Sequence, residues 1–324
     1  MYEIFALLIS LVLTVISGRI VIPLLRRLKV GQPILKYVKE HSSKSGTPTM
    51  GGLFFIIPSV LVFVVFGGLY GKLALICACV GLSFTLVGFL DDFIKIRRAQ
   101  NEGLKAYQKI IFQIALGVLV GVIAWYNGAT YFRLPFSVSG VDLGVATIPF
   151  VAFILIAFTN SVNLTDGLDG LSSSVSVVYL FFCSALILLQ SSAYPLTLQA
   201  EYDKILLLNV CVMGGILGFL LFNVSKAKVF MGDTGSLGLG GFLSAVSIFS
   251  SNALFVPILG IMFVLSSISV IVQVVHFKRT KRRILLMSPL HHHFQLKGYT
   301  ETQITYAYSL ISVVAGLICI IPYV

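Results

Sequence analysis

Apolar runs alternate with short polar segments along the whole chain. The longer runs approach or exceed the roughly 20 residues that a helix needs to cross about 30 Å of hydrocarbon, and no window shows the alternating pattern of barrel strands. We therefore predict an all-α polytopic membrane protein with about ten transmembrane helices. Their approximate limits are 4–25, 51–69, 73–90, 110–126, 146–160, 171–190, 205–222, 236–250, 254–276 and 304–322.

Composition indicates one membrane-embedded unit. Hydrophobic residues make up 57% and charged residues only 11% of the 324 residues, which is far too apolar for a soluble globular chain. With no internal repeat and no soluble segment, residues 1–324 are interpreted as a single integral membrane domain. Glu3 and the lack of a small-residue cleavage site favour a retained first helix over a signal peptide. The five cysteines lie in apolar runs without metal-ligand spacing, which favours packing roles.

Basic residues divide the ends of the predicted helices into two faces. Of the 23 Lys and Arg residues, only Lys72, Arg133 and Lys204 fall on one face; the others lie in or beside the loops after helices one, three, five, seven and nine. Because positive residues mark the cytoplasmic side, this bias predicts that these loops are cytoplasmic and that both termini are extracytoplasmic.

The net charge of +11 thus belongs mainly to one face. It can signal topology alone, or it can also attract anionic lipid head groups or a polyanionic substrate. Nucleic acid is not an expected partner, because the basic residues lie in short loops at the bilayer without a recognition module. On the opposite face, the glycine-containing segment 127–145 predicts a small hairpin.

Five of the 12 acidic residues gather at one membrane level on the cytoplasmic face. Asp91 and Asp92 follow the third apolar run in FLDDFIK, Asp166 and Asp169 lie in NSVNLTDGLDG, and Asp233 lies in VFMGDTGSLGLG. A single acid at a helix end can simply cap that end or pair with a lysine. Three separated clusters beside glycine-rich segments favour a common functional site.

An acidic site for a phosphorylated substrate needs a cation, because carboxylates alone repel phosphate. Mg²⁺ fits, since it takes one or two carboxylates, keeps several waters and fills its remaining positions with substrate phosphates. The neighbouring Lys44, Lys109, Lys226 and Lys228 can hold other phosphate oxygens. This pattern predicts phosphoryl transfer at a membrane surface.

Two further kinds of segment are chemically unusual. GDTGSLGLG and DGLDG match neither a Walker A loop nor an EF-hand, so we interpret them as flexible backbone that can approach an anion beside helices starting near residues 170 and 236. SPLHHHFQLKG, residues 288–298, places three consecutive histidines in the last cytoplasmic loop. Consecutive residues do not easily place three imidazoles on one zinc ion, which favours hydrogen bonding to phosphate or pyrophosphate.

Four motifs together resemble a known family. SKSGTPTMGG (43–52), FLDDFIK (89–95), NSVNLTDGLDG with NVSKAKVFMGDTGSLGLG (160–170 and 223–240) and PLHHHFQLKG (289–298) are similar to motifs of the phospho-N-acetylmuramoyl-pentapeptide-transferases. These enzymes belong to the wider superfamily of polyprenyl-phosphate N-acetylhexosamine-1-phosphate transferases. The likeness runs from about residue 20 to the C-terminus, and TPTMGG and HHHFQLKG point to the muropeptide branch.

This resemblance implies a reaction and a location. Members of the family transfer phospho-N-acetylmuramoyl-pentapeptide from UDP-MurNAc-pentapeptide to undecaprenyl phosphate, which gives lipid I and UMP in the first membrane step of peptidoglycan biosynthesis. The resemblance implies Mg²⁺ as cofactor and a multi-pass protein of the bacterial inner (plasma) membrane. It also implies an active site formed by cytoplasmic loops, and a homodimer is expected from this likeness alone.

The resemblance also implies roles for individual residues. Asp233 would bind Mg²⁺, and Asp91 and Asp92 would assist the metal or deprotonate and position the lipid phosphate. His291 would contact the pyrophosphate, and Asp169 would support its loop by hydrogen bonding. The remaining substrate contacts would come from Lys44, Thr49, Lys109, Asn163, Asp166, Asn223, Phe230 (stacking on uracil), Gly232, His292 and His293.

Alternatives remain for both mechanism and function. The residues are compatible with direct attack of the lipid phosphate and with an aspartyl-phosphate intermediate; direct attack is preferred because Mg²⁺ and lysines can position both phosphates without a covalent step. An undecaprenyl-phosphate GlcNAc-1-phosphate transferase would share the metal chemistry and differ in its donor. An ion-coupled transporter would place ionisable residues near mid-span, whereas here they avoid the span centres, with Arg19 nearest.

Overall fold

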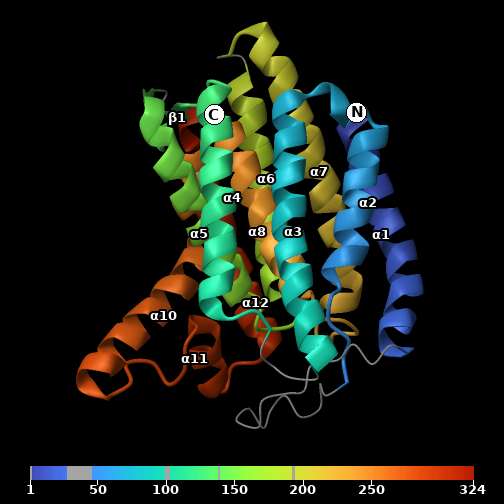
Figure 1. The fold of residues 1–324 in the computed structure, drawn as a ribbon, viewed down its shortest axis with the longest axis vertical. Coiled ribbons are helices and arrows are strands. Elements are labelled where there is room, and N and C mark those ends of the chain that lie inside the picture. Colours follow the sequence, from blue (N-terminus) through green and yellow to red (C-terminus); the bar gives the residue numbers. More distant parts are fainter. Residues whose placement is uncertain (1, 28–45, 99–102, 138, 192–193) are drawn as a thin grey trace.

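The computed structural model describes residues 2–27, 46–98, 103–137, 139–191 and 194–324. Its described part is a bundle of α-helices with one small hairpin (Figure 1). The helices are α1 (Tyr2–Arg27), α2 (Gly52–Val65), α3 (Lys72–Arg98), α4 (Ala106–Tyr126), α5 (Thr147–Thr165), α6 (Leu171–Gln190), α7 (Leu196–Asn223), α8 (Gly232–Phe249), α9 (Val256–Leu259), α10 (Ile261–Thr280), α11 (Leu290–Leu296) and α12 (Glu301–Ile320). Short 3₁₀ turns are η2 (Gly68–Tyr70), η3 (Gly144–Ala146), η5 (Ala253–Phe255) and η6 (Ile321–Tyr323).

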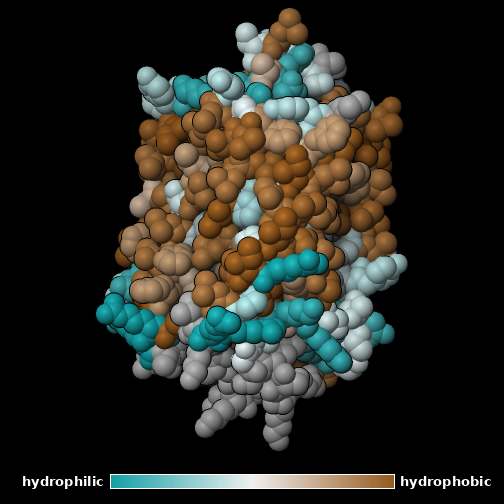
Figure 2. Space-filling model, turned by 90° about the vertical axis from the view of Figure 1, so that its right-hand side faces the viewer, coloured by the Kyte–Doolittle hydropathy of each residue, from teal (hydrophilic) through white to brown (hydrophobic). Residues whose placement is uncertain are grey.

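Each of the ten predicted spans corresponds to a helical segment, and the protein is a polytopic helical membrane protein. Within the described residues, eight helical segments are long and apolar enough to cross a membrane. The other two predicted spans correspond to α2, which has only 14 residues, and to α8, which is rich in glycine and serine. Figure 2 shows the expected surface, a broad hydrophobic band between hydrophilic residues at both ends.

Helix α8 forms the centre of the bundle. Every residue from Thr234 to Phe249 is buried, and α8 packs against α3, α5 and α2. Small residues allow this close packing: a Cβ added to Gly238 would lie 2.1 Å from Thr85 Oγ1, and one added to Gly240 would lie 2.6 Å from Thr159 Cα. Without a hydrophobic effect between helices in lipid, such close backbone approach is a main source of helix association.

Several observed helix ends differ from the predicted limits; α7, for example, begins at Leu196 instead of near residue 205. Helix α3 continues to Arg98 instead of ending before Asp91, because its acidic residues are buried and paired with lysines rather than solvated. Helix α8 begins at Gly232, so GDTGSLGLG is a packed helix and not a flexible loop. The span predicted over 254–276 is interrupted at Gly260, where a Cβ would lie 2.4 Å from the Phe158 ring, and continues as α10.

The predicted hairpin is confirmed in the segment between α4 and α5. Strand β1 (Tyr131–Arg133) pairs antiparallel with β2 (Gly140–Asp142), with Phe132 opposite Val141. Figure 1 places the hairpin and both chain ends at the same end of the bundle, where α3 begins. The second half of α3, with its acidic residues, points to the other end, and so do α10 and α11.

Candidate active site

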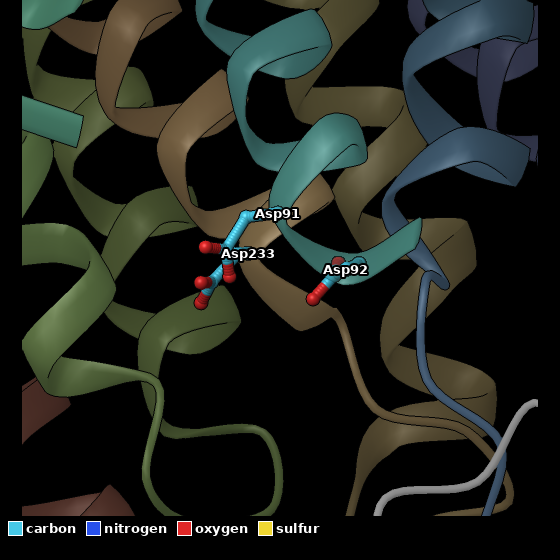
Figure 3. A group of neighbouring side chains, drawn as sticks. All are labelled: Asp91, Asp92 and Asp233. Atoms are coloured by element: carbon cyan, nitrogen blue, oxygen red, sulfur yellow. The ribbon is translucent and has the colours of Figure 1, made fainter. Parts of the chain in front are cut away.

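Three aspartates from two helices meet at one end of the bundle. Asp91 and Asp92 lie on the last turns of α3, and Asp233 lies on the first turn of α8 (Figure 3). One oxygen from each carboxylate can be chosen so that all three lie within 4.8 Å of one another. The side chains of Asp91 and Asp92 are fully buried, and that of Asp233 is 16% exposed. We call these three residues the carboxylate cluster.

A glycine on α3 makes this meeting possible. A Cβ added to Gly88 would lie only 2.0 Å from the backbone oxygen of Asp233. No side chain fits there, so the two helices can approach closely only with glycine at this position. Gly232 has a similar role on α8: its φ is 73°, and a Cβ there would lie 2.6 Å from Asp92 Oδ2.

Two lysines lie among the carboxylates. Lys95 Nζ is 2.6 Å from Asp91 Oδ2, 2.9 Å from Asp233 Oδ2 and 3.8 Å from Asp92 Oδ1. Lys109 Nζ, from α4, is 2.6 Å from Asp233 Oδ2 and 3.1 Å from Asp91 Oδ1. With all five groups ionised, three negative and two positive charges leave one negative charge. A buried set of charges in this geometry is stable only while it stays paired.

Hydrogen bonds fix the orientation of each carboxylate. The backbone N–H and the hydroxyl of Thr234 both donate to Asp92 Oδ2, at 2.8 and 2.7 Å. The backbone N–H of Leu104 donates to Asp91 Oδ1 at 2.8 Å. Asn163 Nδ2 donates to Asp233 Oδ1 at 2.8 Å, which links the end of α5 to the cluster.

The carboxylate cluster has the donor set of a hard divalent cation. Its ligand atoms are carboxylate oxygens, which Mg²⁺ and Ca²⁺ prefer. Asp92 Oδ1 is buried and has no hydrogen-bond partner in the described part of the chain, because Lys95 Nζ at 3.8 Å is too distant. A buried oxygen of this kind is a ready ligand position, so the residues present fit a metal ion.

A cavity of about 240 Å³ opens beside the cluster, and we call it the site cavity. Several residues that were predicted to contact substrate line it together with one cluster member. The lining residues are Thr49, Asn163, Asp166, Gly167, Leu168, Asp169, Asn223, Phe230, Met231, Gly232 and Asp233. The sequence prediction therefore selected residues that the fold brings together from four separate segments.

Backbone hydrogen bonds hold the TPTMGG segment against the start of α8. The Phe230 N–H donates to the Pro48 oxygen at 2.8 Å, and the Gly51 N–H donates to the Phe230 oxygen at 2.9 Å. This clamp places Thr49 and Phe230 on the same cavity. The Thr49 hydroxyl is buried and lacks a hydrogen-bond partner among the described residues, which leaves it able to bind a ligand.

Two polar residues of the site cavity have structural partners. The Asn223 side chain accepts from the Gly170 N–H at 3.1 Å and donates to the Val229 oxygen at 3.0 Å, so its amide joins two loops. Asp169 accepts a hydrogen bond from the Ala227 N–H at 2.9 Å, which confirms its predicted role in supporting the loop.

Asp166 lies in the loop after α5, half-buried at the wall of the site cavity. Burial raises the pKa of its carboxyl well above the ordinary value, and the negative charges of Asp233 and Asp92 raise it further. The protonated form is therefore favoured far more than for a solvated aspartate, and a protonated carboxyl can donate a hydrogen bond to a substrate oxygen.

The three histidines lie on the short helix α11 and separate into different environments. His291 is fully buried, and neither of its ring nitrogens has a partner in the described chain. Burial lowers the pKa of its imidazole to about 3, with His292 as a smaller cause. A Cβ added to Gly167 would lie 2.5 Å from His291 Nε2 and 3.1 Å from His292 Nε2, so both rings lie against Gly167, which lines the site cavity. His293 accepts a hydrogen bond from the Leu286 N–H at 3.1 Å and is not brought to this cavity.

Sequence reasoning missed one central residue and predicted one that cannot be placed. Lys95 was counted only as a topology signal, although its position four residues after Asp91 on one helix face indicated an ion pair. Lys44, which was predicted to bind substrate, lies outside the described residues.

Comparisons with known proteins identify relatives over nearly the whole chain. Residues 74–251 match the model of glycosyl transferase family 4, and residues 44–56 match signature 1 of the phospho-N-acetylmuramoyl-pentapeptide-transferases. A protein of that name from Caldanaerobacter subterraneus is 41% identical over 317 residues, covering 96% of both chains. Proteins of the same name from Bacillus subtilis and Clostridioides difficile are 40% and 38% identical over 321 residues; the alignments cover 97% of this chain and 96% and 95% of the relatives.

Proposed function

The chain belongs to the phospho-N-acetylmuramoyl-pentapeptide-transferase family, and we propose that the carboxylate cluster and the site cavity form its active site. The protein is a membrane-bound transferase of peptidoglycan synthesis. It transfers phospho-N-acetylmuramoyl-pentapeptide from UDP-MurNAc-pentapeptide to undecaprenyl phosphate and produces lipid I and UMP.

One observation carries the assignment of the site. Two buried carboxylates and one partly buried carboxylate, with ligand oxygens within 4.8 Å of one another, adjoin a cavity lined in part by residues predicted to bind the nucleotide. Phosphoryl transfer depends on positioning and on neutralising charge rather than on covalent chemistry. A metal-binding carboxylate set flanked by two lysines supplies both functions at the wall of the cavity.

Mg²⁺ is the proposed metal, held by Asp233 with Asp91 and Asp92. When bound, it would neutralise phosphate charge and polarise the phosphorus–oxygen bonds. Lys95 and Lys109 already contact the same carboxylates, so their ammonium groups lie where diphosphate oxygens would meet the cluster. The Thr234 N–H and hydroxyl keep Asp92 oriented, and Asn163 does the same for Asp233.

The donor is proposed to occupy the site cavity. The half-buried Phe230 ring offers a face for uracil, and the unpaired Thr49 hydroxyl and the Asp166 carboxyl offer hydrogen bonds to polar groups of the donor. His291, beside Gly167, would donate one N–H to the diphosphate. Lys44, Asn223, Gly232 and His292 remain proposed contacts, of which Gly232 and Asn223 shape the cavity wall. His293 lies outside this cavity, so its proposed contact would be with a part of the donor that extends beyond it.

The proposed chemistry is a direct displacement. An oxygen of undecaprenyl phosphate attacks the phosphorus that carries the sugar, the bond from this phosphorus to the oxygen of UMP breaks, and UMP leaves with that oxygen. Asp91 or Asp92 would accept a proton from the lipid phosphate where it is still protonated. An aspartyl-phosphate trapped on either residue would replace this scheme with two successive displacements.

The finer topology is part of the same proposal. We propose ten spans in a single domain of a bacterial inner membrane, with both termini outside and the active site facing the cytoplasm. This topology fits the concentration of basic residues at the aspartate end. The water-borne donor and the lipid acceptor would meet there. A homodimer is proposed from family likeness only.

The decisive experiment offers purified protein undecaprenyl phosphate with either UDP-MurNAc-pentapeptide or UDP-GlcNAc, both labelled in the sugar. Label should enter lipid, with release of UMP, only from the muropeptide donor and only when Mg²⁺ is present. Transfer from UDP-GlcNAc alone would indicate a GlcNAc-1-phosphate transferase. Uptake of label without UMP release would favour transport.

A further inference from the structure

A second cavity lies at the opposite end of α3 and α8 from the carboxylate cluster. Its volume is about 390 Å³, and we call it the hairpin cavity, because β1 forms one wall. From Leu73 at its edge to Asp92 the chain runs along α3 for about 28 Å at 1.5 Å per residue, so the two cavities face opposite sides of the membrane. Its lining residues are Leu73, Asn127, Gly128, Ala129, Tyr131, Arg133, Tyr194, Leu198, Tyr202, Phe249 and Ser251.

Arg133 is a buried cation that faces this cavity. The residue is only 6% exposed, and its backbone N–H donates to the Ser251 oxygen at 2.9 Å, which fixes β1 over the end of α8. Its guanidinium lies over the Tyr194 ring, 4.4 Å from the centroid, and Nε donates to the Tyr194 hydroxyl. Stacking and one hydrogen bond hold the group in a single orientation.

The guanidinium has no acidic partner among the described residues. No carboxylate lies within ion-pair distance, and its two terminal nitrogens make no hydrogen bond to the described chain. Glu201, the acid at the start of α7, uses both oxygens on the Lys72 and Leu73 N–H groups, at 3.3 and 2.8 Å. Asp142, on the neighbouring strand, is exposed and accepts from the Gly144 N–H. A buried, unpaired charge is unfavourable unless a ligand neutralises it.

The cavity combines this cation with hydroxyl groups and apolar walls. Tyr131, Tyr194 and Tyr202 bring phenol groups to it, whereas Leu73, Leu198 and Phe249 contribute apolar wall. The fork of the guanidinium matches the oxygens of a phosphate group. Trp125 and Tyr126, which end α4 beside Asn127, are exposed as expected for an aromatic belt at head-group level.

We propose that the hairpin cavity binds a phosphate group, with Arg133 as its anchor. Two sources share this chemistry: the head group of an anionic phospholipid, and a soluble phosphate. The site is separate from the transfer reaction, so its occupation would stabilise the hairpin and the adjoining ends of α3, α7 and α8 rather than supply a catalytic group.

The test uses full-length protein in detergent and measures binding by native mass spectrometry and by thermal unfolding. The probes are phosphatidylglycerol, inorganic phosphate and, as a control without phosphate, diacylglycerol. Arg133→Gln removes the anchor, and Lys72→Gln removes an exposed positive charge from the same face as a matched control. Leu198→Trp fills the cavity from a half-buried wall position while Arg133 stays in place.

Phosphatidylglycerol should bind wild-type protein and Lys72→Gln with the same affinity. Its affinity for Arg133→Gln should be lower by about tenfold or more, because a charge-assisted hydrogen bond is lost. Leu198→Trp should show a similar loss of affinity, so this variant still tests the proposal if Arg133→Gln fails to fold. Transferase activity should persist in each folded variant. Stabilisation by inorganic phosphate alone would assign the site to soluble phosphates. The proposal would be overturned if wild type, Arg133→Gln and Leu198→Trp all bound each phosphate probe with equal affinity. It would also be overturned if wild type bound diacylglycerol as tightly as phosphatidylglycerol.

Discussion

Lys95 offers the sharpest test of the carboxylate cluster, because its ammonium lies within ion-pair distance of all three members. The variant Lys95→Gln removes the ammonium that lies 2.6 Å from Asp91 and 2.9 Å from Asp233. Breaking a buried ion pair typically costs about 3–5 kcal/mol. Here Lys109 still pairs with both acids, and the Lys95 side chain is 15% exposed, so we expect a loss of about 2–3 kcal/mol of unfolding free energy without metal.

The same variant should respond more strongly to a divalent cation. In wild-type protein a metal ion competes with Lys95 for the same oxygens, whereas in Lys95→Gln the uncompensated carboxylates attract it more tightly. A ligand at 100 times its dissociation constant stabilises the native state by about 2.7 kcal/mol. Mg²⁺ should therefore raise the unfolding temperature of Lys95→Gln further, and at lower concentration, than that of wild type.

The assay is thermal unfolding of detergent-purified protein in EDTA and in a series of Mg²⁺ concentrations. Arg98→Gln is the matched control, since Arg98 is exposed near the end of the same helix and forms no ion pair with the described residues. It should behave like wild type. If Lys95→Gln unfolds at the wild-type temperature in EDTA and Mg²⁺ shifts both proteins equally, then Lys95 neither stabilises the cluster nor competes with a metal ion.

Other variants test the remaining parts of the site. Asp233→Asn should abolish turnover while the protein stays monodisperse in detergent, and near-normal turnover would rule out its metal role. Gly88→Ala places a methyl group 2.0 Å from the Asp233 oxygen, and the resulting displacement should lower kcat by about 10²-fold; substitution of the exposed Leu90 by Ala should not, and equal effects would contradict the packing argument. The pKa of His291 is about 6.5 in the unfolded chain and about 3 in the folded protein. Between these pH values the unfolded chain binds the proton more readily, so the stability of wild-type protein falls as pH decreases. In His291→Gln this part of the decrease, measured by chemical unfolding at pH 7 and pH 4.5, should disappear; an unchanged pH dependence would show that the imidazole is not buried in neutral form.

Hydropathy alone predicted the positions of the ten helical segments, because the length and composition of a span follow directly from the thickness of the bilayer. It could not predict where helices extend beyond the hydrocarbon. Helix α3 continues through Asp91 and Asp92 because Lys95 and Lys109 neutralise them, which is a tertiary effect. The helical start of α8 likewise depends on close neighbours, because Gly88 lies against the Asp233 backbone and Gly52 lies against Gly235.

The sequence predicted which residues belong to the candidate site better than it predicted how they are arranged. Motifs identified Asp91, Asp92 and Asp233, and the fold places them within 4.8 Å. No sequence pattern indicated that Asn223 would use its amide between two loops, because such partners come from residues far along the chain. The sequence also did not indicate that Arg133 is buried and unpaired. As one of three basic residues on its face, it was interpreted only as a topology signal, and its burial depends on how the hairpin packs on α8.

The environment of His291 indicates that this residue can supply a hydrogen bond but not a positive charge. Its buried ring, whose nitrogens have no partners in the described chain, carries a desolvation penalty of about 1–3 kcal/mol until a ligand supplies a hydrogen bond. With a pKa of about 3, the imidazole is neutral at physiological pH and offers one N–H, not a positive charge. In the proposed site, the charge that balances a diphosphate would therefore come from Lys44, Lys95, Lys109 and the metal, whereas His291 would position the diphosphate. Loss of His291 should consequently weaken positioning without changing the affinity of the carboxylate cluster for a cation.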